Sequence, residues 1–423
     1  MKILILLLII SLNLHAQWFE MVLPQSYPIF NDIKFVNGYV GVIVGDSGTI
    51  LRTTNSGLNW NHISINTSKN LKSISITQNY IYVCGDSGIL ICSSNMGESW
   101  DIIPFQFQTN LSDIFFIDTI NGYVVGENSI FKTTNKGMSW IRQTIDNNFF
   151  QSVYFLNKDT GFVTSLRIIS SGIFHSAIYK TTNGGSDWFV QVSVPGEELY
   201  NIYFIDSVGY IVGEHEKVFR TTNYGYTWYE PRPTTPPRPE SFFSIFFVDE
   251  LTGWITGDVE KIYKTSNGGI SWEIQLSRLD LNKQVFLYSI VFKDSNIGFA
   301  VGAQRTSSTF YRGTIFRTTN GGITSFDEKQ NTKRSFQYDL YQNYPNPFNS
   351  LTNISFSLKE SGFTKLKVYD ILGHEIKTLI EENLEGNRNY TITFDANDLG
   401  SGIYFLNLHQ NGKIKTIKMV LMK

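Results

Sequence analysis

The sequence is poor in charge, cysteine and histidine for its length. Charged residues make up 17% of the 423 residues, the formal net charge is -2 and the pI is near 6.3. This balance gives no electrostatic reason to expect nucleic acid or an anionic membrane as a partner. The six histidines have no spacing typical of metal ligands, so the sequence predicts neither a metal site nor a cofactor. The 15% of aromatic residues instead indicates a folded chain with much buried surface.

Long hydrophobic runs are missing after the first sixteen residues. Residues 1–16, "MKILILLLIISLNLHA", carry one Lys, an apolar run and a final small residue, which predicts a signal peptide cleaved after Ala16. A membrane anchor is the alternative, but the run is shorter than the roughly 20 residues of a spanning helix. Export permits disulfides. We nevertheless expect Cys84 and Cys92 to be unpaired packing residues, because a hairpin turning at "GDSG" would place Cys84 opposite Ile89.

One short phrase recurs along most of the chain. "TTNSGLNW" begins at residue 53, and six related phrases follow it at intervals of 40 to 53 residues. Intervals of this size indicate a solenoid or a propeller. The seven asparagines that mark the repeats are Asn55, Asn95, Asn135, Asn183, Asn223, Asn267 and Asn320.

Apolar alternating runs precede each copy of the motif. "DIKFVNGYVGVIVG" at residue 32 and "DIFFIDTINGYVVG" at residue 113 are two examples. Each repeat therefore holds four short runs with the period of a strand and none with the period of a helix. Four strands in each repeat predict an all-β fold, a seven-bladed β-propeller that spans residues 17–325.

The motif itself has the composition of a turn. In "TTNxGxxW" we expect the Asn side chain to bond within its own turn and the Gly to adopt the left-handed conformation. A ligand held by a ring of seven asparagines is the alternative. The Trp that ends the motif begins the outer strand and is expected to fill the wedge between neighbouring blades. These tryptophans are Trp60, Trp100, Trp140, Trp188, Trp228 and Trp272.

The seventh copy of the motif is incomplete. It has Ser325 in the place of Trp, so the last blade lacks its own fourth strand. "QWFEMVL" from Gln17 resembles "SWEIQLS" from Ser271 and puts Trp18 in the missing position. We therefore expect the first strand of the mature chain to complete the last blade, which leaves no open sheet edge.

The two repeated phrases together resemble a known family. "IFFxDxxxGxxVG" followed by "IxxTTNxGxxW" is similar to the propeller family of photosystem II assembly and stability factors, itself similar to the Asp-box (BNR) repeats of sialidases. The resemblance covers about three quarters of the chain. It implies a propeller that acts by binding, without catalysis. The copies here have Asn where the Asp box usually has Asp.

The character of the sequence changes after a polar linker at 326–340. Residues 341–423 alternate strands with Gly and Asn turns, which predicts a small β-sandwich. "YPNPF", "VYDILGHEI" and "LGSGIY" resemble, in order and spacing, the type A C-terminal sorting domain of the Por, or type IX, secretion system. The resemblance implies handling by that machinery, passage through the periplasm and outer membrane, removal of the domain, and surface attachment or release. A carbohydrate-binding sandwich is the alternative.

A sialidase-like glycoside hydrolase is the alternative function of the propeller. That chemistry needs an arginine cluster beside acid and nucleophile residues. Six basic residues instead share one repeated strand position just before the motif and are expected to be solvated: Arg52, Arg220, Arg317, Lys132, Lys180 and Lys264. We therefore expect no catalytic residues and a binding or scaffolding role.

The lengths of the connections predict where a partner binds. Connections between second and third strands share one face of a propeller with those between blades, here called the long-loop face, and the motif turns lie on the opposite, motif face. The long segments 165–177, 231–240 and 303–313 all fall on the long-loop face. We expect a protein or glycan to bind there. The candidate binding residues from these segments are the aromatic residues Phe174, Phe310 and Tyr311. The acidic residues that follow the second strands are further candidates: Asp46, Asp86, Glu127, Glu214 and Asp258. For these acids, a role in forming the turn is the alternative.

Overall fold

The chain forms two compact units, Met1–Thr324 and Ser325–Lys423. The structure, a computed structural model, describes residues 18–170, 173–231, 240–258, 261–277, 284–307, 310–322, 338–340, 343, 346, 348–386 and 388–422. The predicted signal peptide, most of the predicted linker and residues 232–239 of the Pro-rich segment lie outside this description. The regular elements of the described residues are strands, apart from two 3-10 turns, so the predicted all-β class is confirmed. Among these residues we find no helical segment with the length and apolar character of a membrane span.

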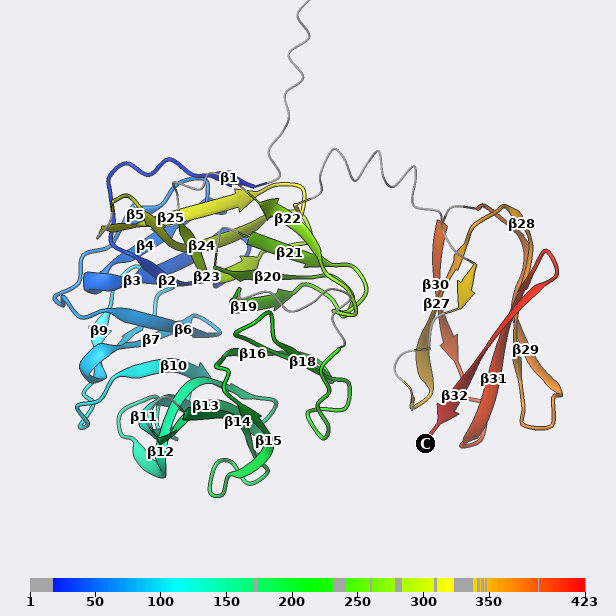
Figure 1. Ribbon diagram of the computed structural model, residues 1–423, viewed down its shortest axis with the longest axis horizontal. Helices are drawn as coiled ribbons and strands as arrows, with labels where there is room; N and C mark the ends of the chain where they lie inside the picture. Colours follow the sequence, from blue (N-terminus) through cyan, green and yellow to red (C-terminus); the bar gives the residue numbers. More distant parts are fainter. Residues whose placement is uncertain are drawn as a thin grey trace, which may run out of the picture. The chain divides into compact units, whose positions relative to one another are not determined.

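The first unit is a ring of antiparallel sheets, as Figure 1 shows. The first two repeats form one four-stranded sheet each. The 3-10 turns η1 (Asp46–Gly48) and η2 (Asp86–Gly88) connect their second and third strands. The strands are β2 (Phe30–Phe35), β3 (Gly41–Gly45), β4 (Ile50–Thr53) and β5 (Asn61–His62), then β6 (Leu71–Thr77), β7 (Tyr80–Gly85), β8 (Leu90–Ser93) and β9 (Asp101–Ile102).

The third and fourth repeats share one six-stranded sheet. Its strands are β10 (Leu111–Phe116), β11 (Gly122–Thr133), β12 (Ile141–Phe155), β13 (Gly161–Ser170), β14 (Ile173–Thr181) and β15 (Phe189–Pro195). β11 pairs with β10 through its first half and with β12 through its second half, with a register shift between Glu127 and Ser129. β12 continues into the fourth repeat, where it pairs with β13. Because two repeats merge in this way, the count of seven blades stays a prediction.

The remaining repeats form three further sheets of the ring. The fifth repeat has β16 (Leu199–Ile205), β17 (Val208–Gly213) and β18 (Val218–Thr221), with one bridge from Arg220 to Tyr229. The sixth has β19 (Phe242–Phe247), β20 (Gly253–Gly257), β21 (Lys261–Thr265) and β22 (Glu273–Ser277). The last has β23 (Val285–Phe292), β24 (Gly298–Arg305) and β25 (Tyr311–Thr318).

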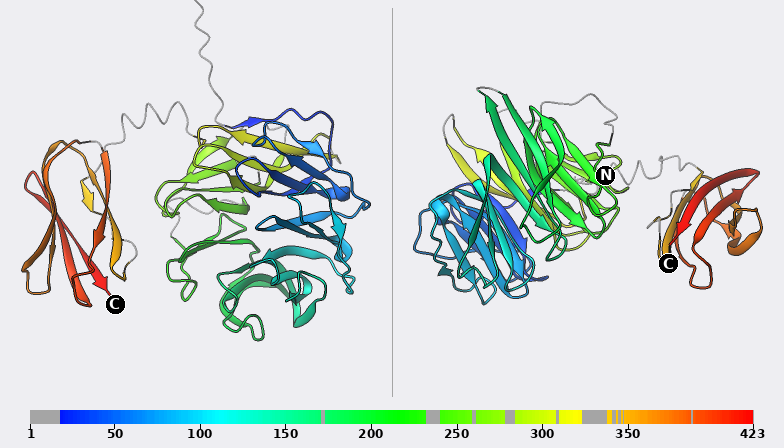
Figure 2. Two further views of the ribbon diagram at one scale, coloured as in Figure 1. Left: turned by 180° about the vertical axis from the view of Figure 1, so that it is seen from behind. Right: turned by 90° about the horizontal axis from the view of Figure 1, so that it is seen from below.

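The ring is closed by the start of the chain. β1 (Phe19–Glu20) pairs with β25 and becomes the fourth strand of the last sheet. The indole of Trp18 is 0% exposed and stands edge-on to Phe292, with 5.7 Å between ring centroids. All three ribbon views place the blue first strands beside the yellow last ones (Figures 1 and 2). The predicted closure by the segment around Trp18 is therefore confirmed.

A ring of polar side chains joins the inner strands at the axis of the first unit. Each inner strand has a register shift just before one polar residue. The side chain of each accepts a hydrogen bond from the next repeat or donates one to it, as in Ile74 N to Asp32 Oδ2 at 2.8 Å and Ser289 Oγ to Asp32 Oδ1 at 2.6 Å. We call these residues the polar collar: Asp32, Ser73, Asp113, Ser152, Asn201, Ser244 and Ser289.

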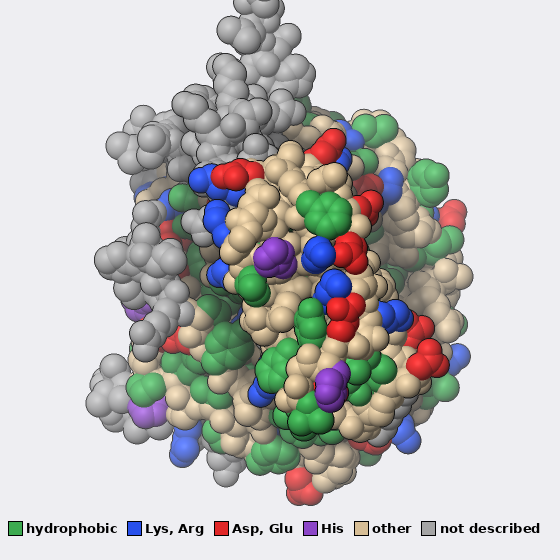
Figure 3. Space-filling model, turned by 90° about the vertical axis from the view of Figure 1, so that its right-hand side faces the viewer, with side chains coloured by type: hydrophobic (Ala, Val, Ile, Leu, Met, Phe, Trp, Pro, Cys, Tyr) green, Lys and Arg blue, Asp and Glu red, His purple; other side chains and the backbone are tan. Residues whose placement is uncertain are grey.

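The Ser325–Lys423 unit is a sandwich of two antiparallel sheets. One contains β26 (Asp339–Leu340), β27 (Leu351–Leu358) and β30 (Arg388–Asp395), and the other contains β29 (Glu375–Leu384), β28 (Gly362–Tyr369), β31 (Gly402–Gln410) and β32 (Lys413–Leu421). Side chains from both sheets, such as Phe356 and Leu406, share one buried core. Its surface carries exposed ion pairs, such as Lys365 with Glu381 at 2.7 Å. Basic and acidic side chains are interspersed on the visible face of Figure 3.

Candidate functional site

The motif turns have the same hydrogen bonds in all seven repeats. The first Thr or Ser donates its hydroxyl to the Asn Oδ1 at 2.8 to 3.0 Å, and the motif Gly donates its N–H to that hydroxyl. In the first six repeats the Asn Oδ1 also accepts the N–H four residues on. The polar atoms of the motif asparagines are thus engaged within their own turns. The repeated asparagines of the motif face therefore stabilise their own turns.

Glycine and tryptophan of the motif pack between repeats. Gly225 has a φ of 67°, and a Cβ built on it would lie 2.3 Å from Cζ of Phe162 in the preceding repeat. Trp228 stands edge-on to the same Phe162 ring, with the centroids 5.9 Å apart. Trp60 has the same edge-on relation to Phe299, across the closure of the ring. The motif tryptophans therefore fill the wedge between neighbouring repeats.

The basic residues before the motif are not solvated, so that expectation was wrong. Lys180 is 2% exposed and its Nζ lies 4.0 Å from the centroid of the Tyr226 ring in the next repeat. Nζ of Lys132 donates to the Gly184 carbonyl at 2.7 Å, and Nε of Arg52 donates to the Met96 carbonyl at 2.9 Å. The alternation of buried and exposed side chains along one strand predicts that these basic side chains are exposed. The motif turn of the following repeat covers them instead. These residues connect repeats and do not gather into an arginine cluster.

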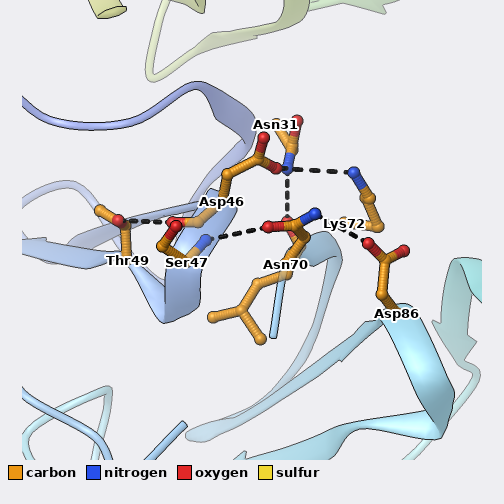
Figure 4. A network of polar contacts seen from close by, with 8 residues as sticks. Asn31, Asp46, Ser47, Thr49, Asn70, Lys72 and Asp86 are labelled. Carbon is orange, nitrogen blue, oxygen red and sulfur yellow. Dashed lines mark hydrogen bonds and ion pairs between the residues drawn. The ribbon is translucent and has the colours of Figure 1, made fainter. Parts of the chain in front are cut away.

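Acids on the long-loop face take part in a network that links the repeats (Figure 4). Asn70 accepts the N–H of Ser47 at 3.0 Å and donates to Oδ2 of Asp86 at 2.8 Å. Asn31 donates to Oδ1 of Asp46 at 2.8 Å, and Lys72 lies 3.5 Å from the same oxygen. Figure 4 shows Asn70 between the two turns, where it joins the first repeat to the second.

The same arrangement recurs one repeat further on. Asn110 accepts the N–H of Ser87 at 2.9 Å and donates to Oε1 of Glu127 at 2.9 Å. Asp46, Asp86 and Glu127 therefore each accept a hydrogen bond from an Asn side chain, the first two within the turns η1 and η2 and Glu127 within the strand β11. Asp258 differs from these three, because burial and the nearby Glu240 raise the pKa of its carboxyl group.

Five aromatic rings form a continuous band beside the polar collar, on the long-loop face. Ring centroids lie 5.3 Å apart for Tyr200 and Phe243, 5.4 Å for Phe243 and Tyr288, 6.4 Å for Tyr288 and Phe286, and 6.1 Å for Phe286 and Tyr311. Each ring is partly exposed. We call Tyr200, Phe243, Tyr288, Phe286 and Tyr311 the aromatic band. Partly exposed aromatic side chains in contact are typical of binding surfaces.

Two glutamates lie at the Tyr200 end of the aromatic band. The Tyr200 hydroxyl donates to Oε1 of Glu214 at 3.4 Å, and the N–H of Glu198 donates to Oε2 of Glu214 at 3.0 Å. Burial and then the Glu214 carboxylate raise the pKa of Glu198, which a hydrogen bond from Tyr200 partly offsets. In the middle of the band, burial, Tyr311 and Asp46 raise the pKa of Tyr288. Acidic groups thus lie near the Tyr200 end and near the central Tyr288 ring.

Of the three aromatic residues predicted to bind a partner, one belongs to the aromatic band and two lie outside it. Tyr311 belongs to the aromatic band, and Phe310 in the same hairpin is 70% exposed. Phe174 lies apart in β14, where it is partly buried and pairs with Ile168. The segments around these residues are largely extended hairpins of β13 with β14 and of β24 with β25, not irregular loops.

Most of the aromatic band was missed from the sequence. Tyr200, Phe243 and Tyr288 occupy one repeated position, next to the polar collar on the inner strand. The first four repeats have polar residues there: Asn31, Lys72, Ser112 and Gln151. A change from polar to aromatic within one column of the repeat alignment is the signal that would have identified this part of the band.

The motif face also exposes apolar side chains. They come from the first-to-second turns and from the motif turns: Tyr39, Leu58, Ile120, Met138, Tyr224, Tyr226, Leu251 and Ile270. Tyr226 is 72% exposed while its ring covers Lys180. These residues lie in pairs on the first, third, fifth and sixth repeats, without the chain of ring contacts that defines the aromatic band.

The free cysteines agree with the prediction, with one correction to the register. Cys84 is buried, and both Cys84 and Cys92 are free thiols. Cys84 pairs with Leu90 across the hairpin, and not with Ile89, because the 3-10 turn η2 lengthens the connection. Packing is therefore their described role.

A β-propeller followed by a small sandwich is the class of protein that this fold defines, and comparisons with known proteins agree. Residues 342–423 match the family model of the secretion system C-terminal sorting domain, and residues 10–108 match that of the photosynthesis system II assembly factor YCF48. The C-terminal unit is therefore a secretion sorting domain, and the propeller resembles the YCF48 family. No curated protein matches the chain.

Solved structures give the same picture of the fold. YCF48 bound to a D1 peptide is 18% identical, with a TM-score of 0.56 over 72% of this chain and 97% of that one. YCF48 from Cyanidioschyzon merolae is 17% identical, also with a TM-score of 0.56, over 72% of this chain and 99% of that one. A GH74 xyloglucanase from Xanthomonas campestris is 9% identical, with a TM-score of 0.56 over 95% of this chain and 67% of that one. At these identities the likeness shows the propeller fold alone.

A sorting domain of this kind implies export. It indicates the type IX secretion machinery as the system that handles the chain, with the cell surface or the extracellular space as the destination. The remaining question is what the exported propeller does.

Proposed function

We propose that the chain is a non-catalytic binding or scaffolding propeller, exported through the periplasm and outer membrane, whose partner docks on the long-loop face. The observation that supports this proposal is the aromatic band, where five partly exposed rings are in contact. On the motif face the polar groups that recur in each repeat already bond to each other. A partner that binds along a row of aromatic rings in contact therefore finds that row on the long-loop face.

The export half of the proposal is tested by moving the sorting domain. Deletion of residues 341–423 should leave a folded propeller in the periplasm, and fusion of these residues to an unrelated periplasmic reporter should carry the reporter out. Cell fractionation measures both. Appearance of the truncated propeller at the surface or in the medium would contradict this route.

The binding half is tested by a screen of the intact exported chain against glycans and envelope proteins. Any ligand found is then measured against a Phe310→Ala, Tyr311→Ala variant and a Lys136→Ala, Glu98→Ala variant. The first pair of changes lies on the long-loop face and should weaken binding. Loss of binding in the second variant alone would move the partner to the motif face.

A glycoside hydrolase is a second candidate because of one feature of the long-loop face. Glu198 and Glu214 are neighbouring carboxyl groups, and burial with the Glu214 charge raises the pKa of Glu198. A carboxyl group with a raised pKa beside a second carboxyl group is the usual acid and base pair of glycosidases. Release of sugar from sialosides or xyloglucan, lost in Glu198→Gln, would replace the binding proposal by this one.

A further inference from the structure

The aromatic band has the form of a surface for an extended peptide. Its successive ring centroids lie between 5.3 and 6.4 Å apart. In an extended chain, side chains on the same face repeat every two residues, or roughly 6.6 to 6.8 Å. A peptide lying along the band can therefore place each second side chain against a ring. The band is partly exposed, so these contacts need no rearrangement of the core.

The charges next to the band favour a basic partner. Asp46, near the central Tyr288 ring, is already paired with Lys72 at 3.5 Å. At the Tyr200 end Glu198 and Glu214 lie against each other. In the described part of the chain, the ion pairs of this region go to other acids: Lys217 to Glu197 and Glu230, and Lys261 to Glu240. A positive charge between the two glutamates would relieve their mutual repulsion, which a neutral sugar would not do.

The Tyr200 ring adds a second attraction for the same charge. Its hydroxyl is held by Glu214, so the ring is fixed beside the two carboxylates. A Lys or Arg cation over a Tyr face is stabilised by the ring quadrupole. The propeller already contains this contact on its motif face, where Nζ of Lys180 lies 4.0 Å from the Tyr226 centroid.

We propose that the aromatic band binds an extended basic peptide segment of another protein, with a Lys or Arg side chain against Tyr200 between Glu198 and Glu214. The inference rests on the proposed binding role of the long-loop face and names the class of partner. The alternating side chains of the peptide lie along Phe243, Tyr288 and the rest of the band. The acidic end sets the direction in which the peptide lies.

The test uses the intact exported chain and three labelled peptides. Each is an acetylated, amidated nonapeptide of Ser and Thr with Lys, norleucine or Glu at positions three and seven. Fluorescence anisotropy should show the Lys peptide binding at least about tenfold tighter than the other two. The Glu198→Gln, Glu214→Gln variant should lose about tenfold of the affinity for the Lys peptide, and Tyr200→Leu should also weaken binding.

The matched control is Glu98→Gln, Asp187→Asn, which removes two acids of the motif face and should leave binding unchanged. Thermal unfolding followed by tryptophan fluorescence shows that each variant is folded. Equal binding of the Lys and norleucine peptides by folded wild-type protein would overturn the inference.

A glycan control separates this inference from the proposed function. If a glycan from the screen loses affinity in Phe243→Ala or Tyr288→Ala while the Lys peptide does not bind, the long-loop face is a binding face and the basic-peptide assignment is wrong. If ligands lose affinity only in the motif-face variant, both statements are wrong.

Discussion

The motif face and the long-loop face use the same repeats in different ways. On the motif face, Thr, Asn and Gly form the same bonds in each of the seven turns. On the long-loop face, the column next to the polar collar changes from Asn31 and Lys72 in early repeats to Tyr200, Phe243 and Tyr288 in late ones. A repeat can vary a position only where its own folding does not depend on it. The difference is what the proposed binding role of the long-loop face requires, with the folding contacts of the repeat on the motif face.

The largest expected effect comes from a change in the closing strand of the ring, on which both faces depend. Trp18→Ala takes a fully buried indole from the closing strand and should lower the free energy of unfolding by about 3–5 kcal/mol. Val22→Ala, in the same segment, is the control, since Val22 is 98% exposed. All eight tryptophans lie in the first unit, so tryptophan fluorescence in a denaturant series reports the propeller alone. Equal midpoints for the two variants would contradict the closure.

A pair of glycines compares the faces directly. Gly225 of the motif face and Gly196 between β15 and β16 have φ of 67° and 74°. A Cβ on Gly225 would lie 2.3 Å from Phe162, whereas a Cβ on Gly196 meets nothing within 4 Å. Gly225→Ala should therefore cost about 2–4 kcal/mol of stability, and Gly196→Ala only the backbone strain of about 1–2 kcal/mol. The same denaturant series measures both, and a larger loss for Gly196→Ala would reverse the comparison.

A pair of asparagines makes the same comparison for polar side chains. Asn135 accepts from Thr133 and from the N–H of Ser139, both at 2.9 Å, and donates to Ser139 Oγ. Asn110 makes two bonds in an exposed network. Asn135→Ala should cost about 1–3 kcal/mol and Asn110→Ala less than about 1 kcal/mol. Similar losses would mean that the long-loop network is as important for folding as the motif.

The sequence was sufficient to predict features that lie within one repeat, but not the contacts that form between repeats. The turn chemistry of Asn135 and the closing role of Trp18 could be predicted because each is visible in one repeat or in one alignment of two. Lys180 looked solvated because the residue that covers it, Tyr226, belongs to the next motif. The aromatic band escaped for the same reason, since its neighbours Tyr200 and Phe243 are brought together by the ring and not by one strand.

The merged sheet of the third and fourth repeats was also beyond sequence reasoning. β12 runs without interruption from the outer strand of one repeat to the inner strand of the next. The run from Ile141 to Phe155 has no Gly or Pro that would force a break. An alignment of the repeats predicts two separate strands in this segment, because the other repeats have a break between their outer strand and the next inner strand.

Binding experiments extend the comparison from folding to recognition. Ala at Phe174, Phe310 and Tyr311 should weaken binding of a ligand found by screening by more than about 1 kcal/mol if one of them is an anchor. Ala at Lys136, Tyr224 and Glu98 on the motif face should leave binding nearly unchanged. Phe174 lies apart from the aromatic band, so we expect Phe310 and Tyr311 to account for the loss. Isothermal titration of single variants decides this, and a dominant effect of Phe174 would place the partner on the β13–β14 hairpin.

The smallest expected effect is a pH dependence of basic-peptide binding. Burial and Glu214 raise the pKa of Glu198 in the free protein. The peptide cation favours the ionised carboxylate, so affinity should be full above the raised pKa and fall as the pH drops through it. The fall should begin at a higher pH than for an ordinary glutamate. Peptide titrations between about pH 4.5 and 8 measure it.

The neighbouring histidine has to be separated from this effect. His215 Nδ1 lies 3.8 Å from Glu197, and a positive charge on this ring would repel the peptide cation. In His215→Gln the fall in affinity should persist, because it belongs to Glu198. In Glu198→Gln it should flatten, because the carboxyl group that takes up the proton is gone and Lys217, already paired with Glu197 and Glu230, does not titrate there. An unchanged profile in Glu198→Gln together with a flat profile in His215→Gln would assign the pH dependence to the histidine and remove Glu198 from the contact with the cation.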